Sequence, residues 1–288
     1  MNECIHDVFV FNNLIRAQKD FDDYYLKAGK SFYEVLRLID GCCLFLEDHF
    51  ERLENSLRIF SIDYKIDYEH ITNNISELIS NNNIIHGNIK LIINFNEIRK
   101  KKPDVLVYFV RHKYPSSAQY RHGIDASLLT MERIMPNAKY INDDAITDAN
   151  RELPDRNIYE TLLVNEEGLL TEGSKSNVFF IKDDTIFTSP VEKVLPGITR
   201  KYVICICNEQ NIRLIEQDIS ISDLNKYSTV FLSGTSAKIL PVKRINDLFF
   251  QVNNNILKKI MKTYNKKIIE YCSDKNKKKQ EITSSGYS

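Results

Sequence analysis

The chain has 288 residues, which is enough for about two domains with ordinary hydrophobic cores. Its 39 Lys and Arg residues balance its 39 Asp and Glu residues, so no net charge attracts nucleic acid or an anionic membrane. The N-terminal residues lack the basic-then-apolar plan of a secretory signal, and the longest apolar run, Val105 to Val110, is far shorter than the ~18 residues of a membrane span. The composition therefore predicts a soluble protein with no nucleic-acid or membrane partner.

The cysteines and histidines form no disulfide or metal-binding pattern. Six cysteines in a chain of this length without an export signal fit a reducing cytoplasm better than a disulfide framework. Cys205 and Cys207 have no neighbouring histidine, and the six histidines show no HExxH spacing. We therefore expect a cytoplasmic protein without a bound metal.

The first part of the chain alternates strand and helix patterns. Residues 30–39 are predicted to form a strand, because their hydrophobic pattern is that of a strand bounded by polar residues. A helix is then predicted from apolar residues at helical spacing, namely Leu46, Phe50, Leu53, Leu57 and Phe60. Asp48 followed by Glu51 predicts a capping-box start for this helix. Two further strands are predicted at residues 90–95 and 104–110.

A polar segment from Tyr114 to Gly123 is typical of a linker. It divides the chain into a small N-terminal α/β domain, residues 1–117, and a larger strand-rich domain, residues 118–288. The tail from about Ser273 lacks apolar periodicity, and we expect it to be frayed. The sequence thus predicts a mixed α/β (α+β) fold with two lobes.

The second domain shows short strand patterns separated by turns. The predicted strands are residues 124–131, 158–164, 177–182, 185–188 and 228–232. Helices are predicted near residues 141–153 and 198–209. A sheet is therefore expected to be the main element of this domain.

Two glycine-containing turns of the second domain could hold an anion. The break at Leu195-Pro-Gly197 precedes the predicted helix, so the amide of Ile198 and the hydroxyl of Thr199 lie at its positive end. The turn from Ser233 to Ser236 supplies hydroxyls and amides as a second cluster of donors. Each turn taken alone also fits an ordinary helix start or an ordinary loop.

Three further side chains suit a single cofactor. Arg52 lies beside the apolar stripe of its helix, where a guanidinium could bind a phosphate in a bidentate manner. Lys139 lies between a predicted strand and helix, where partial desolvation favours a nucleophilic amine. Glu172 ends the arm of a predicted hairpin, so its carboxylate would project at a strand end. A phosphate anchor, an amine and a fixed carboxylate are what pyridoxal 5'-phosphate requires of a protein.

Several motifs follow one another in the order of a known enzyme family. They are Phe32-Tyr-Glu-Val-Leu-Arg37 with Asp40-Gly41, His49-Phe-Glu-Arg52-Leu53, Lys139 with Asn142, Thr171-Glu172-Gly173 through Phe179, Thr188-Ser-Pro190, Leu195-Pro-Gly-Ile-Thr-Arg200, and Gly234-Thr235 with Pro241-Val242. By this collinear set the chain resembles the class IV aminotransferases. These fold-type IV pyridoxal-phosphate enzymes include branched-chain aminotransferases, D-amino acid aminotransferases and aminodeoxychorismate lyases.

The resemblance implies a reaction and the residues that perform it. Lys139 would form the Schiff base with the cofactor and move the proton at the substrate α-carbon. Glu172 would pair with the pyridine nitrogen and keep it protonated. Tyr33 would face the substrate. The implied activity is transfer of an amino group between an amino acid and a 2-oxo acid, and the alternative is a lyase that releases pyruvate from aminodeoxychorismate.

The resemblance also implies how the cofactor is held. Its phosphate would be bound by Arg52, Ile198, Thr199 and Thr235, and Leu195 would lie against the face of its ring. The family further implies a homodimer.

The chain departs from the family pattern around the substrate. Residues 25–31 lack the usual Gly-Asp-Gly run, and Asp144 stands where branched-chain members have a tyrosine. Arg99 follows the strand at residues 90–95 without the histidine of the D-amino acid branch. Arg99 and Lys175 are interpreted as solvated surface residues, with binding of a substrate carboxylate as the alternative. The choice between D and L substrates stays open.

Overall fold

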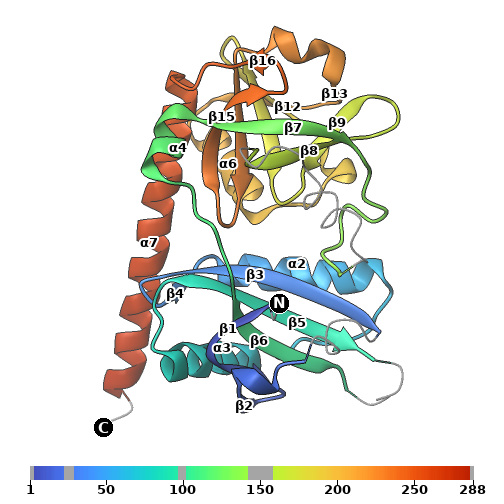
Figure 1. The fold of residues 1–288 in the computed structure, drawn as a ribbon. Helices are drawn as coiled ribbons and strands as arrows, with labels where there is room; N and C mark the ends of the chain where they lie inside the picture. The colour runs from blue at the N-terminus through green and yellow to red at the C-terminus, as the bar shows by residue number, and fades with distance from the viewer. Residues whose placement is uncertain (1–2, 23–28, 97–101, 142–157, 286–288) are drawn as a thin grey trace. The chain divides into compact units, whose positions relative to one another are not determined.

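The computed structural model describes residues 3–22, 29–96, 102–141 and 158–285. It divides into two compact units, drawn as a ribbon in Figure 1. The first unit comprises residues 1–113, 138–142 and 267–288, and the second comprises residues 114–137 and 143–266. This division differs from the domain boundary predicted after residue 117, because residues 138–142 and 267–288 belong to the first unit. A linker pattern marks where the chain leaves a unit and carries no information on where it returns.

The first unit is built on a six-stranded antiparallel sheet of order β2-β1-β6-β5-β3-β4. Its strands are β1 (Cys4–Phe11), β2 (Leu14–Ala17), β3 (Lys30–Ile39), β4 (Cys42–Cys43), β5 (Gly87–Phe95) and β6 (Asp104–Val110). Helices α2 (Leu46–Ile59) and α3 (Tyr68–Asn82) pack on one face of the sheet (Figure 1). The strands predicted at residues 30–39, 90–95 and 104–110 are confirmed. Helix α3 has no counterpart among the predicted elements.

Alternation along β3 explains which side chains face the helices. Phe32, Leu36 and Leu38 are fully buried and belong to the core cluster that includes α2 and α3. Glu34 lies on the same face and is also fully buried, although it carries a carboxylate. Tyr33 projects from the opposite face, where it packs against a second apolar cluster. The strand thus places Glu34 and Tyr33 on opposite sides of one sheet.

Helix α2 begins earlier than its predicted capping box, and that prediction is wrong. Its first residue is Leu46, its N-cap is Phe45 in the left-handed region, and no side chain caps it. The amide of Leu46 instead donates to the hydroxyl of Tyr271, 3.0 Å away. A residue 225 positions further along the chain therefore replaces the local cap that Asp48 was expected to supply.

The second unit contains a ten-stranded mixed sheet of order β12-β11-β10-β14-β15-β7-β8-β9-β13, with β16 paired to β15. Its strands are β7 (Ile124–Thr130), β8 (Glu160–Val164), β9 (Leu169–Gly173), β10 (Asn177–Lys182), β11 (Thr185–Thr188), β12 (Arg213–Glu216), β13 (Ile219–Ser220), β14 (Thr229–Gly234), β15 (Lys238–Ile245) and β16 (Leu248–Phe249). One apolar cluster draws residues from β10 and β14 as well as from β8, β9 and β13. The sheet therefore curls around its own core.

One helix of the second unit was predicted from the sequence, and another was missed. Helix α6 (Ile198–Glu209) has the predicted bounds and packs against β14. The segment interpreted as a linker contains α4 (Ser117–His122), so that interpretation is wrong over these residues. Ser116 and Gln119 form a capping box, a local signal that the polar composition of the segment concealed.

The C-terminal segment is helical, so the expectation of a frayed tail from Ser273 is wrong. Helix α7 extends over Asn255–Ser285. Leu257, Ile260, Tyr264 and Ile268 are buried at helical spacing along its first half. Lysine and glutamate are good helix formers, so the polar continuation extends a helix that packing has already nucleated. Among the residues that the structure describes, no helix combines the length and apolar character needed to cross a membrane.

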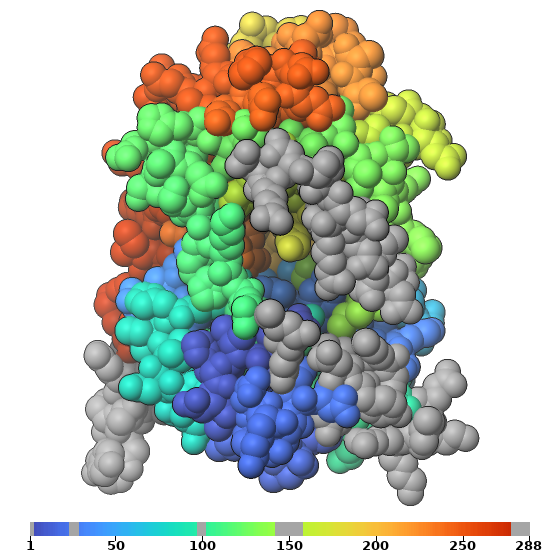
Figure 2. All heavy atoms as spheres, viewed as in Figure 1, coloured from blue at the N-terminus to red at the C-terminus, as the bar shows by residue number. Residues whose placement is uncertain are grey.

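The remaining strand predictions of the second unit match β7, β8, β10, β11 and β14 within a few residues. The helix predicted near residues 141–153 falls almost entirely outside the described residues. Strand β16 lies at the surface, where Figure 2 shows the orange atoms of this part of the chain, and Phe249 is 78% exposed.

Candidate active site

A buried carboxylate organises the candidate residues of the first unit. The guanidinium of Arg52, on α2, donates from Nε to Oε1 of Glu34 at 2.8 Å and from Nη2 to Oε2 at 2.5 Å. The Nδ1 of His49 donates to the same Oε2 at 2.7 Å. All three residues are buried. At least two donors of the Arg52 fork therefore serve Glu34, which fixes the plane of the guanidinium.

The charges of this cluster follow from its burial and its partners. Burial opposes ionisation of Glu34, but the charge and hydrogen bonds of Arg52, aided by His49, outweigh it and lower the pKa of Glu34 to about 2. Burial also lowers the pKa of His49, against the pull of Glu34, and the charges of Arg52 and Lys139 act in the same direction as burial. The cluster therefore holds an ionised Glu34 beside Arg52 and favours a neutral His49.

Lys139 is held through its backbone in the same unit. Its amide donates to the hydroxyl of Ser56 at 2.9 Å, and its carbonyl accepts from the amide of Tyr33 at 3.1 Å. The Ser56 hydroxyl in turn donates to the carbonyl of Arg52 at 3.0 Å. The Lys139 ammonium lies 4.4 Å from the centre of the Tyr33 ring. The structure thus brings together Tyr33, Arg52 and Lys139, three of the residues singled out from the sequence.

A second lysine lies over the same tyrosine. The Nζ of Lys90, on β5, is 5.1 Å from the centre of the Tyr33 ring. It also forms an ion pair of 2.6 Å with the carboxylate of Glu3, which accepts from the hydroxyl of Tyr108 at 3.1 Å. Two ammonium groups therefore face one aromatic ring on this side of the sheet.

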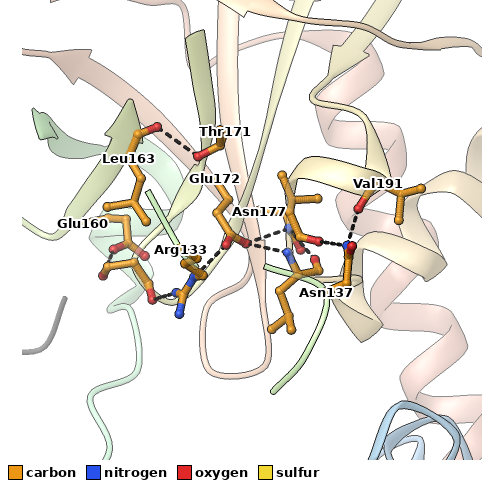
Figure 3. Close-up of polar contacts among 11 residues, drawn as sticks. Arg133, Asn137, Glu160, Leu163, Thr171, Glu172, Asn177 and Val191 are labelled. Carbon is orange, nitrogen blue, oxygen red and sulfur yellow. Dashed lines mark hydrogen bonds and ion pairs between the residues drawn. The ribbon is translucent and has the colours of Figure 1, made fainter. Parts of the chain in front are cut away.

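In the second unit the carboxylate of Glu172 lies at the centre of a polar network, drawn in Figure 3. Its Oε1 accepts from the Nε of Arg133 at 2.7 Å. Its Oε2 accepts from the amide of Leu195 at 3.1 Å and from the side-chain amide of Asn177 at 3.4 Å. The Glu172 side chain is only 4% exposed. The network therefore supplies a buried charge with a cation and oriented donors.

Asn177 and Gly197 fix the segment that contains Leu195. The side-chain amide of Asn177 also donates to the carbonyl of Leu195 at 2.8 Å. A Cβ on Gly197 would lie 2.1 Å from the Oδ1 of Asn177. Gly197 has a φ of −64°, so this position needs glycine because of space and not because of backbone conformation.

The first turn of α6 presents amides without a protein cap. Gly197 is its N-cap and supplies no side-chain hydrogen bond, and no acidic residue lies in the first turn. The Thr199 hydroxyl lies 3.3 Å from the hydroxyl of Tyr264. Thr235 is half-buried in the turn that follows β14, the strand against which α6 packs. The second unit thus contains Glu172, Leu195, Ile198, Thr199 and Thr235.

The buried carboxylate of Glu160 accepts hydrogen bonds from the turn between β9 and β10. The hydroxyls of Ser174 and Ser176 donate to Oε1 and Oε2 of Glu160 at 2.6 and 2.8 Å. Lys175 lies between these serines and is exposed, which agrees with its interpretation as a surface lysine. Asp144 and Arg99 lie outside the described residues.

Sequence reasoning missed Arg133 and gave no role to Glu34 or Asn177. Glu34 could have been found, because it is a charged residue at an inward position of an alternating strand. Asn177 belongs to a quoted motif, but its contacts depend on the fold. No local signal marks Arg133, which becomes a neighbour of Glu172 only through the arrangement of the strands.

Comparisons with known proteins show the family of the chain. The family model for "Amino-transferase class IV" matches residues 31–245, about three quarters of the chain. The chain belongs to the class IV aminotransferase family.

Similar proteins come from several branches of this family. The D-alanine aminotransferase of Bacillus licheniformis is 27% identical over 236 residues, which cover 79% of this chain and 83% of that protein. A putative branched-chain-amino-acid aminotransferase of Methanocaldococcus jannaschii is 26% identical over 255 residues, covering 85% and 88%.

Solved structures show the same fold. The branched-chain amino acid aminotransferase of Escherichia coli superposes with a TM-score of 0.79 at 23% identity, covering 92% of this chain and 95% of that one. The 4-amino-4-deoxychorismate lyase of Pseudomonas aeruginosa gives a TM-score of 0.76 at 19% identity, covering 88% and 97%.

The Glu34 cluster predicts a specific acid response. At neutral pH, Glu34→Gln should lower the free energy of unfolding by about 3–5 kcal/mol, because Arg52 loses its buried counter-charge. The folded pKa of about 2 lies below the ordinary 4.5, so the wild type loses this contribution as the pH falls from 4.5 towards 2. Urea titrations at pH 7 and pH 3 should show the difference between the two proteins shrinking. A difference of equal size at both pH values would contradict the ion pair, and exposed Glu77→Gln on α3 is the control.

The close approach at Gly197 predicts a steric effect. Gly197→Ala should lower the free energy of unfolding by about 1–3 kcal/mol, because the methyl group displaces Asn177 from Glu172 and Leu195. The loss should be small when the same change is made in an Asn177→Ala background, where the clash is absent. Equal losses in both backgrounds, measured by urea unfolding, would show that the contact is not the cause.

Proposed function

We propose that the chain transfers an amino group between an amino acid and a 2-oxo acid, with pyridoxal 5'-phosphate as cofactor and Lys139 as the reactive amine. The observation that carries this proposal is the Glu172 carboxylate, which is buried and held by donors on both oxygens. An ionised carboxylate in such a place suits a ring nitrogen that must remain protonated.

The donors of the second unit fit the phosphate end of this cofactor. The amides of the first turn of α6 have no side-chain cap, and a helix start of this kind favours an anion. In the described part of the chain, the buried hydroxyl of Ser233 has no hydrogen-bond partner, and this residue precedes the Gly234-Thr235 turn. A buried polar atom left unsatisfied is expected where a ligand completes a site.

Similar proteins support the choice of cofactor. Another branched-chain amino acid aminotransferase, with a TM-score of 0.79 and 21% identity to this chain, was solved with pyridoxamine 5'-phosphate. When bound, pyridoxal 5'-phosphate supplies a ring that accepts electrons as an amino group is moved.

Three residues would have separate roles at the cofactor. Lys139 would bind the cofactor through Nζ and then carry a proton at the same atom, and its backbone bonds to Ser56 and Tyr33 restrict where that amine can lie. Glu172 would hold the proton on the ring nitrogen. Leu195 would cover one face of the ring.

The phosphate would be held by a fixed fork and a helix start. Arg52 would bind it with a guanidinium that Glu34 has already oriented. The Ile198 and Thr199 amides, the Thr199 hydroxyl and Thr235 would supply the remaining donors. Tyr33, with its ring beside the Lys139 ammonium, would face the substrate. We further propose a homodimer located in the cytoplasm.

Chemical trapping tests the assignment of Lys139. Borohydride reduction of the protein loaded with pyridoxal 5'-phosphate should attach the cofactor to the peptide containing Lys139. Lys139→Ala should remove that label and lower the rate of amino transfer by about 10²–10⁴-fold or more. The control is Lys175→Ala, which removes an exposed lysine near Glu172 and should leave the label in place. Labelling of another lysine in the wild type would overturn the assignment.

Half-reactions separate amino transfer from the lyase alternative. An aminotransferase mixed with one suitable amino acid and no oxo acid should convert its bound cofactor to the aminated form, seen by absorbance. A lyase given aminodeoxychorismate should release pyruvate without that conversion. A panel of single D- and L-amino acids also reads out the substrate. No conversion with any of them would contradict the proposed transfer.

A further inference from the structure

The side chain of Arg133 joins two parts of the Glu172 network. Arg133 follows β7, and Figure 3 shows its guanidinium beside the carboxylate of Glu172. Its Nε donates to Oε1 of Glu172, and its Nη2 donates to the carbonyl of Ser174, each at 2.7 Å. One planar group therefore fixes both the carboxylate and the turn that follows it in the chain.

The two partners differ in their access to water. The Glu172 side chain is 4% exposed, whereas that of Arg133 is 28% exposed. A carboxylate so deeply buried is costly to leave without a cation, while a guanidinium at the edge of the network keeps part of its hydration. Loss of the ion pair would therefore cost more free energy at Glu172, which water cannot reach, than at Arg133.

We propose that Arg133 is a resident cation of Glu172. It holds the carboxylate ionised and oriented before the cofactor arrives, and it then competes with the ring nitrogen for the same charge. This inference depends on the proposed function, because the ring nitrogen is that of pyridoxal 5'-phosphate. Arg133 is thus a positioning residue, acting on the cofactor through Glu172.

Competition between two cations has a consequence that a merely structural arginine would not produce. In the wild type the ring nitrogen approaches a carboxylate that Arg133 has already neutralised in part. In a variant with a neutral side chain at this position, the ring nitrogen approaches a carboxylate that Arg133 no longer neutralises. Loss of Arg133 should therefore weaken the cofactor-free protein while strengthening its attraction for the protonated ring.

The test compares Arg133→Met and Arg133→Lys with the wild type, each with and without pyridoxal 5'-phosphate. We expect Arg133→Met to lower the melting temperature of the cofactor-free protein more than that of the loaded protein. Stability and cofactor binding are linked, so a variant that is destabilised mainly in its cofactor-free form must bind the cofactor more tightly. We expect Arg133→Met to bind it roughly threefold to tenfold more tightly than the wild type, measured by fluorescence titration. Arg133→Lys keeps the charge, so its affinity should stay near that of the wild type. Arg133→Gln is a second neutral variant in case the methionine variant does not fold.

Two controls isolate the ring nitrogen. A cofactor analogue with carbon in place of that nitrogen should bind Arg133→Met no more tightly than the wild type. The second control is Arg244→Met, which removes an arginine of similar exposure. The Arg244 side chain is 33% exposed and forms an ion pair of 3.0 Å with Asp125. This variant should lower the melting temperature equally with and without cofactor.

The outcomes separate this inference from the proposed function. If the wild type does not bind pyridoxal 5'-phosphate, the proposed function fails. If the wild type binds it but Arg133→Met and Arg133→Gln bind it equally well or more weakly, only the competition fails. An equal gain in affinity for the carbon analogue would also overturn the inference.

Discussion

The burial of Glu172 is the constraint on which the site of the second unit depends. A carboxylate that water cannot reach must be given donors by the protein, and the fold supplies them from three separate segments. Arg133 comes from the segment after β7, Asn177 from β10, and the Leu195 amide from the segment before α6. Each of these segments is consequently fixed with respect to the strand end that carries Glu172.

The first unit also contains a buried carboxylate, but its donors come from a single helix. Glu34 is also buried, and Arg52 and His49 satisfy it from one helix. Because α2 also contains Ser56, whose hydroxyl accepts from the Lys139 amide, the same helix connects the oriented guanidinium to the backbone of Lys139. Hydrogen bonds therefore connect Glu34 to Arg52, the Arg52 carbonyl to Ser56, and Ser56 to Lys139.

Sequence patterns predicted those features that local chemistry determines. The bounds of β3 and α6 follow from periodicity and from the break at Gly197, and the motif order indicated the family. The roles that this order assigns to Lys139, Glu172 and Arg52 stay predictions. Features set by distant contacts were missed. The start of α2 depends on Tyr271, the packed half of α7 carries a polar tail that composition alone describes as frayed, and Arg133 meets Glu172 only in the folded sheet.

The central expectation is an ionised Glu172 that keeps the ring nitrogen of the bound cofactor protonated. The most direct measurement is the nitrogen-15 spectrum of the protein loaded with pyridoxal 5'-phosphate labelled at the ring nitrogen. We expect the shift of a protonated nitrogen in the wild type at neutral pH, and that of an unprotonated nitrogen in Glu172→Gln. An unprotonated nitrogen in the wild type, or a protonated one in both proteins, would contradict it.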